Sequence, residues 1–239
     1  MFSVSVQRYR DEQVLVVSVI SGCTQVRFQS QKNHKMYCDR WGYEYIWDEK
    51  PREIKSPYDH KIHALLDLPV DDRWWFWVDD DAFFTQMDTP LESFFENFDK
   101  KAQLVFAKSP INPKGGWTYL SSGNFFFRSS KKVHKFLESV LASDLVTIKQ
   151  WWDADKLGMF TKGDQDKIVY QLFQQRRMMK RTKILPYDTF NFRPYHFEKS
   201  LDEHFLSHFA VPGVAKVDSI EEFRARFNFP DSSLTMPAY

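Results

Sequence analysis

The first half of the chain consists of apolar runs separated by amphipathic stretches. Residues 14–20 form a continuous β-branched run followed by Ser21 and Gly22, a pattern typical of a buried parallel strand. A helical pattern covers residues 25–41, and Gly42 stands where it should end. By the same criteria we expect further strands over residues 43–47, 74–78, 103–107 and 123–128, and further helices over residues 57–68, 130–145 and 165–177.

Strands that alternate with helices from the start of the chain predict an α/β fold, with a mostly parallel central sheet flanked by helices. The 239 residues contain no internal repeat and no low-complexity linker, so we predict a single domain over residues 1–239. In such sheets ligands bind at the carboxyl ends of the strands. Ser21-Gly22 and the Asp79-Asp80-Asp81 run both follow predicted strands, which makes them candidates for one site.

The composition narrows the range of partners. The 33 Lys and Arg residues balance the 32 Asp and Glu residues, so the sequence predicts no polyanion-binding surface and no nucleic-acid partner. Aromatic residues make up 17% of the chain, and we assign most of them to the core. Aromatic ring faces also stack on the apolar faces of sugars, so this content is compatible with a sugar-handling cleft.

The cysteines and the apolar runs bear on the cell compartment. Cys23 and Cys38 show no paired spacing, so neither a disulfide framework nor a zinc site is expected, and reduced thiols fit a cytoplasmic protein. The chain shows no signal-like apolar region and no transmembrane segment. We therefore expect a cytoplasmic protein. The alternative is a protein of the Golgi lumen whose membrane anchor is absent from this chain.

Three consecutive acids, Asp79, Asp80 and Asp81, follow the bulky apolar run at residues 74–78. Side chains at i and i+2 of an extended chain point to the same side, so Asp79 and Asp81 can share one divalent cation. The alternative is a solvated, Asp-rich turn, which is common after strands. The Trp and Phe residues on both sides of the acids favour the metal site over the exposed turn.

Several segments carry motif-like sequences, and they follow one another in the chain as residues 33–43, 77–87 and 121–128, Gly163-Asp164-Gln165, and His208-Phe209. In this order they resemble motifs of GT-A glycosyltransferases, in particular the family 34 galactosyl-, xylosyl- and mannosyltransferases. The resemblance covers about residues 14–216 and departs from the family at several points. Gly163 stands where the family has an Asp, and Ser121-Ser122 stand where it has Asn-Thr. The Lys expected after the His-Phe pair is displaced, with Lys216 the nearest candidate.

This resemblance implies a metal site and a donor site. Asp79, Asp81 and His208 would bind Mn²⁺ or Mg²⁺, and an oxygen-rich site with one imidazole favours Mn²⁺. Asp80 would reach the ribose hydroxyls. Gly123 would let the backbone approach the sugar closely. The remaining residues assigned to the donor are Ser18, Ile20, Ser21 and Gly22 after the first strand, with Asn33, Lys61 and Lys216.

The resemblance also implies the reacting centre. Gln165 would lie beside the anomeric carbon, while Asp164 orients hydroxyl groups of the donor or acceptor. Transfer would then retain the donor's configuration. If transfer inverts the configuration instead, a carboxylate must deprotonate the acceptor, and Asp164 or Asp166 is the candidate base.

We therefore expect a metal-dependent glycosyltransferase that moves a sugar from a nucleoside diphosphate donor to a hydroxyl of a glycan acceptor, with UDP favoured over GDP. One alternative is a non-catalytic sugar-binding module, for which an acidic diphosphate site would have no use. Another is a metal-dependent phosphohydrolase, which would need further His and Asp motifs that the sequence lacks.

Overall fold

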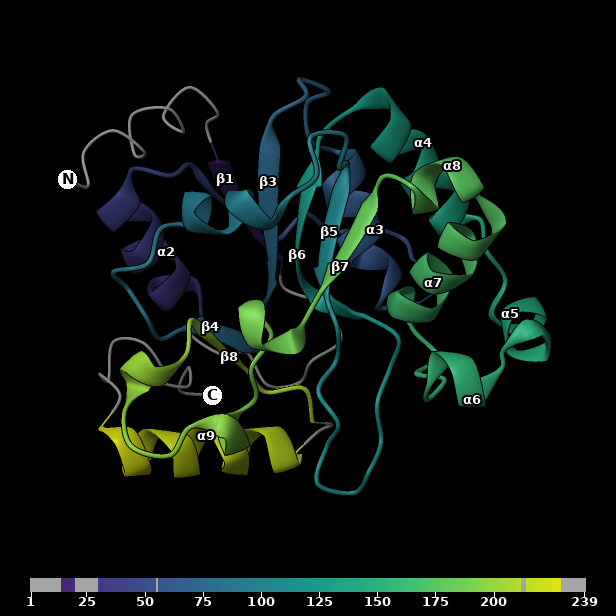
Figure 1. Ribbon diagram of the computed structural model, residues 1–239. Coiled ribbons are helices and arrows are strands. Elements are labelled where there is room, and N and C mark those ends of the chain that lie inside the picture. Colours follow the sequence, from purple (N-terminus) through teal and green to yellow (C-terminus); the bar gives the residue numbers. More distant parts are fainter. Residues whose placement is uncertain (1–13, 20–29, 55, 212–213, 229–239) are drawn as a thin grey trace.

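A mixed six-stranded sheet forms the centre of the part of the chain that the structure describes. The computed structural model describes residues 14–19, 30–54, 56–211 and 214–228 (Figure 1). The strands of this sheet are β1 (Val14–Val19), β2 (Tyr45–Asp48), β3 (Trp74–Asp79), β5 (Leu104–Ala107), β6 (Ser121–Arg128) and β7 (Thr182–Leu185), in the order β2-β1-β3-β6-β5-β7.

The α/β fold expected from the sequence is confirmed. Three of the five strand pairings are parallel, and β6 is antiparallel to both of its neighbours. Within the described residues, the α-helices of eight or more residues are α2 (Ser30–Trp41), α3 (Asp59–Leu66), α4 (Lys131–Leu141), α7 (Asp164–Gln174) and α9 (Val214–Phe227), and the shorter ones are α5 (Leu145–Trp151), α6 (Ala154–Leu157) and α8 (Arg176–Met179).

Strand β3 is apolar from Trp74 to Val78 because both faces of the sheet are covered. Along β3, Trp75 and Trp77 pack into the core cluster shared with α3, α4 and α7, while Trp74 and Phe76 pack into the cluster shared with α2. Successive side chains of a strand point to opposite faces, so alternate aromatic residues fill the two layers. Figure 1 shows α3, α4 and α7 on one side of the sheet and α2 on the other.

A second, small sheet lies beyond the carboxyl end of β3. It consists of β4 (Ala82–Phe84) and β8 (Leu206–His208), which are antiparallel, with Ala82 opposite His208. The pairing brings together segments that are more than a hundred residues apart in the chain. Helix α9 runs beside this small sheet (Figure 1), and Phe223 of the helix packs with Phe83 and Phe209 in a third apolar cluster.

The predicted strands are confirmed with end shifts of at most two residues, but two predicted helices are wrong in extent. The helix expected over 130–145 ends at Leu141, because the carboxylate of Asp144 accepts a hydrogen bond from the Thr147 amide and starts α5. The helix expected over 165–177 is interrupted at Gln175, whose backbone is not helical. Of the helix expected over 25–41, residues 25–29 lie outside the described part.

Gly42 follows α2 with a φ of 71°, the left-handed conformation that favours glycine after a helix. Strands β4, β7 and β8 and helix α9 were not predicted. In the described part of the chain, no helix has both the length and the apolar character needed to cross a membrane.

Candidate functional site

The acidic run forms the turn between β3 and β4. Asp79 is the last residue of β3, and Trp77 donates a hydrogen bond from its indole nitrogen to Oδ1 of Asp79 over 2.7 Å. The next strand begins at Ala82, and the carbonyl of Asp81 accepts a hydrogen bond from the amide of Phe209. The acids are therefore held by strands on both sides, of which the sequence predicted β3 but not β4.

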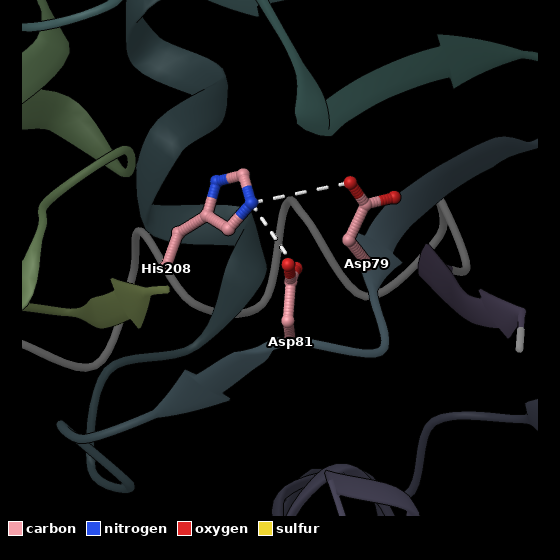
Figure 2. Close-up of side chains that lie close together, drawn as sticks. All are labelled: Asp79, Asp81 and His208. Carbon is pink, nitrogen blue, oxygen red and sulfur yellow. Dashed lines mark ion pairs between the residues drawn. The ribbon is translucent and has the colours of Figure 1, made fainter. Parts of the chain in front are cut away.

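His208 meets this turn because β8 pairs with β4. Its Nε2 lies 3.1 Å from Oδ1 of Asp81 and 4.0 Å from Oδ2 of Asp79 (Figure 2). One candidate ligand atom from each of the three residues lies within 4.8 Å of the other two. The structure thus brings together the three predicted metal-binding side chains, and all three point toward one another (Figure 2).

Gly123 on β6 makes room for the imidazole of His208. A Cβ atom at this position would lie 2.2 Å from Cε1 of His208, far closer than two carbon atoms can approach. The space that the sequence analysis assigned to a sugar is therefore filled in part by the His208 ring.

The residues of this cluster fit a divalent cation. Two carboxylates and one imidazole are a common donor set for such an ion. Nδ1 of His208 is buried and has no hydrogen-bond partner among the described residues, and Oδ1 of Asp81 is buried with only the contact to Nε2 of His208. Buried polar atoms normally have such partners, so a bound ion would satisfy part of this unmet demand.

Two lysines offset part of the negative charge. Lys61 on α3 lies between Asp79 and Asp164, with Nζ–oxygen distances of 2.9 and 3.2 Å, and also donates to the carbonyl of Ser122. Lys216 on α9 donates to Oδ2 of Asp81. The attraction of Asp164 and Asp79 outweighs burial and raises the pKa of Lys61, so this lysine stays charged.

The three neighbouring acids titrate differently. Burial, with the charge of Asp81, raises the pKa of both Asp79 and Asp80. Burial also acts to raise the pKa of Asp81, but His208 and Lys216 together outweigh it and hold this pKa well below its usual range. Carboxylates this crowded repel one another, so a cation placed between Asp79 and Asp81 would be strongly attracted.

The start of α7 supplies the remaining predicted residues. Oε1 of Gln165 accepts a hydrogen bond from the amide of Ser122 over 3.3 Å, and Asp164 pairs with Lys61. Asp166 instead caps its own helix, accepting hydrogen bonds from the Thr161 hydroxyl and the Lys162 amide. Asp164 and Gln165 line the cleft described below, whereas Asp166 is absent from its lining.

Except for Asp166, these groups line one cleft of about 650 Å³. The sequence placed the site at the carboxyl ends of the strands, and β3 contributes its acids from that end. Strand β6 is antiparallel and lines the cleft with Ser121, Ser122 and Gly123 at its amino end. The sequence-predicted residues that line it are Lys61, Asp79, Asp80, Asp81, Gly123, Asp164, Gln165, His208 and Lys216.

Of the other predicted donor-binding residues, Asn33 is absent from this lining. Both ends of the Asn33 amide are occupied by the backbone of Phe84, with distances of 2.9 and 2.7 Å, so Asn33 holds α2 against β4. Ser18 lies in β1, and Ile20, Ser21 and Gly22 lie outside the described residues.

Arg193 lines the cleft and was missed by the sequence analysis. Its side chain is 8% exposed. It stands in an irregular segment before β8, where neither periodicity nor a motif signals a role, so only the folded structure shows its position.

Comparison with known proteins confirms the fold. No protein-family model matches the chain, and no curated protein is similar enough in sequence to count as a match. The crystal structure of a glycosyltransferase involved in glycosylation of the major capsid of PBCV-1 matches with a TM-score of 0.63 and 16% identity, covering 89% of this chain and 99% of that one.

Two further solved structures match at a TM-score of 0.50 and 12% identity. The apo-form glycosyltransferase GlyE of Streptococcus pneumoniae TIGR4 is matched over 89% of this chain, and the bifunctional glycosyltransferase WbbM over 93%. This chain spans 60% of the first and 51% of the second. The fold is that of the GT-A glycosyltransferases, which confirms at this level the resemblance seen in the sequence.

Proposed function

We propose that the protein is a metal-dependent glycosyltransferase that moves a sugar from a nucleoside diphosphate donor to a hydroxyl of a glycan acceptor. The observation that carries this proposal is the convergence of Asp79, Asp81 and His208, at the carboxyl end of β3, in a cleft of a GT-A fold. Among nucleotides we favour UDP over GDP.

The cluster would hold Mn²⁺ or Mg²⁺ through one atom each of Asp79, Asp81 and His208. Such an ion acts as a Lewis acid that neutralises charge on the departing diphosphate. We favour Mn²⁺ because imidazole ligands suit it better than they suit Mg²⁺. Lys216, which contacts Asp81, is near enough to bind a phosphate oxygen of the donor.

The start of α7 would contact the sugar. Gln165 is held beside Ser122 and Gly123 at the cleft wall, where its amide can stabilise positive charge that grows at the anomeric carbon. The ion pair between Asp164 and Lys61 supports a retaining transfer, because a carboxylate committed to a lysine is a poor general base. The acceptor proton would then pass to the leaving phosphate as the new glycosidic bond forms.

A neighbouring cavity of about 500 Å³ is the place we propose for the acceptor. It shares Ser109 and Thr118 with the main cleft. Trp117 and Tyr119 line it and offer ring faces to a sugar. The peptide groups of both residues are hydrogen-bonded to residues 157–159, which holds the two rings in place.

Calorimetry of UDP binding tests the proposed function. Wild-type protein should bind UDP with Mn²⁺ present and at least tenfold more weakly with EDTA, and Asp81→Ala should lose the metal-dependent part. Asp155→Ala, which removes an exposed carboxylate on α6, serves as the matched control. UDP affinity that EDTA leaves unchanged would refute metal-dependent donor binding.

A panel of nucleotide sugars with Mn²⁺ then identifies the donor. The expected result is nucleotide release from one donor, accelerated by a sugar acceptor. Sugar binding without any nucleotide binding would instead support the non-catalytic module.

A further inference from the structure

Arg193 is a buried cation that the metal site and the lysine pairs leave unexplained. Its Nη1 donates hydrogen bonds to the carbonyl of Asn191, to Oδ1 of Asn191 and to the carbonyl of Phe192, at distances of 3.1, 2.7 and 3.2 Å. These bonds fix the guanidinium plane. Within the described residues they are also its only hydrogen bonds, so Nε and Nη2 keep their donor capacity.

Arg193 differs in this respect from the two lysines of the cleft. Lys61 and Lys216 each contact a carboxylate, whereas no carboxylate of the described residues lies within ion-pair distance of Arg193. Burial lowers its pKa to about 10, so it is still charged at neutral pH. A buried charge is costly unless it is paired, which indicates that a ligand supplies the missing anion.

The position of the guanidinium narrows the choice of anion. Arg193 lines the same cleft as Asp79, Asp81 and His208, and the amide of His208 donates to the carbonyl of Phe192, the preceding residue. The backbone of Arg193 is thereby tied to the strand that carries His208. An anion bound here would lie beside the metal cluster.

From this arrangement we infer that Arg193 binds the diphosphate of the donor. The inference rests on the proposed function and extends it to a residue that the metal site does not include. A divalent cation balances the charges of Asp79 and Asp81, and Lys61 remains paired with Asp164. The two negative charges of a sugar diphosphate then meet Lys216 and Arg193. A planar guanidinium matches two phosphate oxygens at once, which an ammonium group cannot do.

Arg193 would also stabilise the nucleoside diphosphate that is released as a product. When the bond between the anomeric carbon and the phosphate oxygen breaks, charge on the diphosphate grows, and Arg193 is already oriented to receive it. We therefore expect its removal to weaken binding of the nucleoside diphosphate but not of the nucleoside.

Binding measurements with three probes test this inference. UDP, inorganic pyrophosphate and uridine are titrated by calorimetry into wild-type protein and Arg193→Met, each with Mn²⁺ and with EDTA. UDP and pyrophosphate should bind at least tenfold more weakly to the variant under both conditions, with uridine unchanged. Arg177→Met, at an exposed arginine of α8, is the matched control and should behave as wild type.

The variant Arg193→Lys shows whether weaker binding by Arg193→Met comes from a lost contact or from a folding defect. It keeps the charge but loses the planar fork, so it should recover part of the affinity for pyrophosphate while its melting temperature stays close to that of Arg193→Met. Arg193→Lys binding no better than Arg193→Met, with both melting far below wild type, would indicate a structural role and overturn the inference.

Failure of this inference and failure of the proposed function can be told apart. If Arg193→Met binds UDP and pyrophosphate as wild type does while Asp81→Ala does not, Arg193 is not a diphosphate-binding residue but the metal site stands. If Arg193→Met weakens both probes although EDTA has no effect, the metal site fails and Arg193 stands. Weakened binding of glucuronate, with pyrophosphate unaffected, would assign Arg193 to an acidic sugar and refute the diphosphate assignment.

Discussion

At the scale of single residues, the absence of a side chain at Gly123 shapes the metal cluster as directly as the ligands do. The Cβ of an alanine would strike the His208 ring at 2.2 Å. We expect Gly123→Ala to displace the imidazole and to weaken Mn²⁺ binding roughly 10- to 100-fold, as the loss of groups that orient metal ligands commonly does. The overpacking should also lower stability by about 1–3 kcal/mol. Calorimetry of Mn²⁺ binding gives the affinity.

A double variant shows whether Gly123 acts through His208. If it does, adding Gly123→Ala to His208→Ala should cost no further metal affinity, because the ring to be displaced is already gone. Equal costs in the two backgrounds would show that Gly123 acts on the site in another way.

A variant of His208 tests whether this residue is a metal ligand or a packed core residue. We expect His208→Ala to lower turnover by about a hundredfold or more, while stability changes by no more than about 1–2 kcal/mol, because the cluster loses a ligand rather than a packed apolar group. Turnover and melting temperature are measured on the same preparation. A large drop in melting temperature with normal turnover of the folded fraction would assign His208 to the core.

The sequence predicted the position of a site residue only where the residues next to it in the chain define that position. Asp79 and Asp81 are adjacent in sequence to a strand, so the strand's geometry predicted their shared direction. His208 was found only through the resemblance, because its place depends on pairing with β4 across the chain. Arg193 has no local signal at all, and its unpaired burial exists only in the folded state.

At the scale of elements, the position of the candidate metal site depends on how α2 supports β4. The side-chain amide of Asn33 donates a hydrogen bond to the carbonyl of Phe84 and accepts one from its amide. His34 donates from Nε2 to the carbonyl of Ala82 over 2.7 Å. Both interactions hold the strand that immediately follows Asp81. The sequence analysis assigned Asn33 to the donor, because a polar residue in a family motif does not reveal whether it meets a ligand or a strand.

His34 makes this support sensitive to pH. Burial lowers its pKa from 6.5 to about 4, although its hydrogen bond to Ala82 acts in the opposite direction. The unfolded chain therefore binds a proton at a higher pH than the folded chain does. The stabilising contribution is fully present above about pH 6.5 and is lost as the pH falls toward 4, to a total of about 3 kcal/mol.

We expect His34→Gln to remove this part of the acid sensitivity, because Gln can donate to Ala82 but cannot take up a proton. Urea unfolding at several values between pH 4 and pH 7 gives the free energy of unfolding. His63→Gln, at a partly buried histidine of α3, is the control and should follow the wild-type curve. A His34→Gln curve as steep as that of wild type would contradict the assignment.

The sequence predicted the helices and strands that show a clear hydrophobic pattern. It did not predict the elements that are held in place by residues far away in the chain. The run at residues 74–78 is long and apolar because two layers cover it. Strands β4 and β8 have three residues each, too few for a period to appear. Helix α9 is held by Ile220 and Phe223 against Phe209, contacts that require the rest of the fold.

At the scale of the whole molecule, the cleft joins three units that are separate in sequence. The acidic turn ends β3, the start of α7 brings Asp164 and Gln165, and the segment from β8 into α9 brings His208 and Lys216. Lys61 bridges the first two units through its contacts with Asp79 and Asp164. In the proposed function, donor and acceptor would meet where these units converge, so the course of transfer would depend on the assembled cleft.

The arrangement predicts that transfer retains the donor's configuration and that Gln165 acts mainly in the transition state. Asp164 is paired with Lys61, and Asp166 caps α7, so among these residues neither carboxylate is free to deprotonate an acceptor. With the leaving phosphate taking that proton, Gln165 needs only to stabilise positive charge at the anomeric carbon. Gln165→Ala should therefore lower kcat by roughly a hundredfold with little change in UDP affinity. Gln174→Ala, at an exposed position of the same helix, should be neutral.

Proton NMR of the product made from an α-linked donor reads the stereochemistry directly. An α-linkage supports retention, whereas a β-linkage would make Asp164 the base, released from Lys61 when the donor binds.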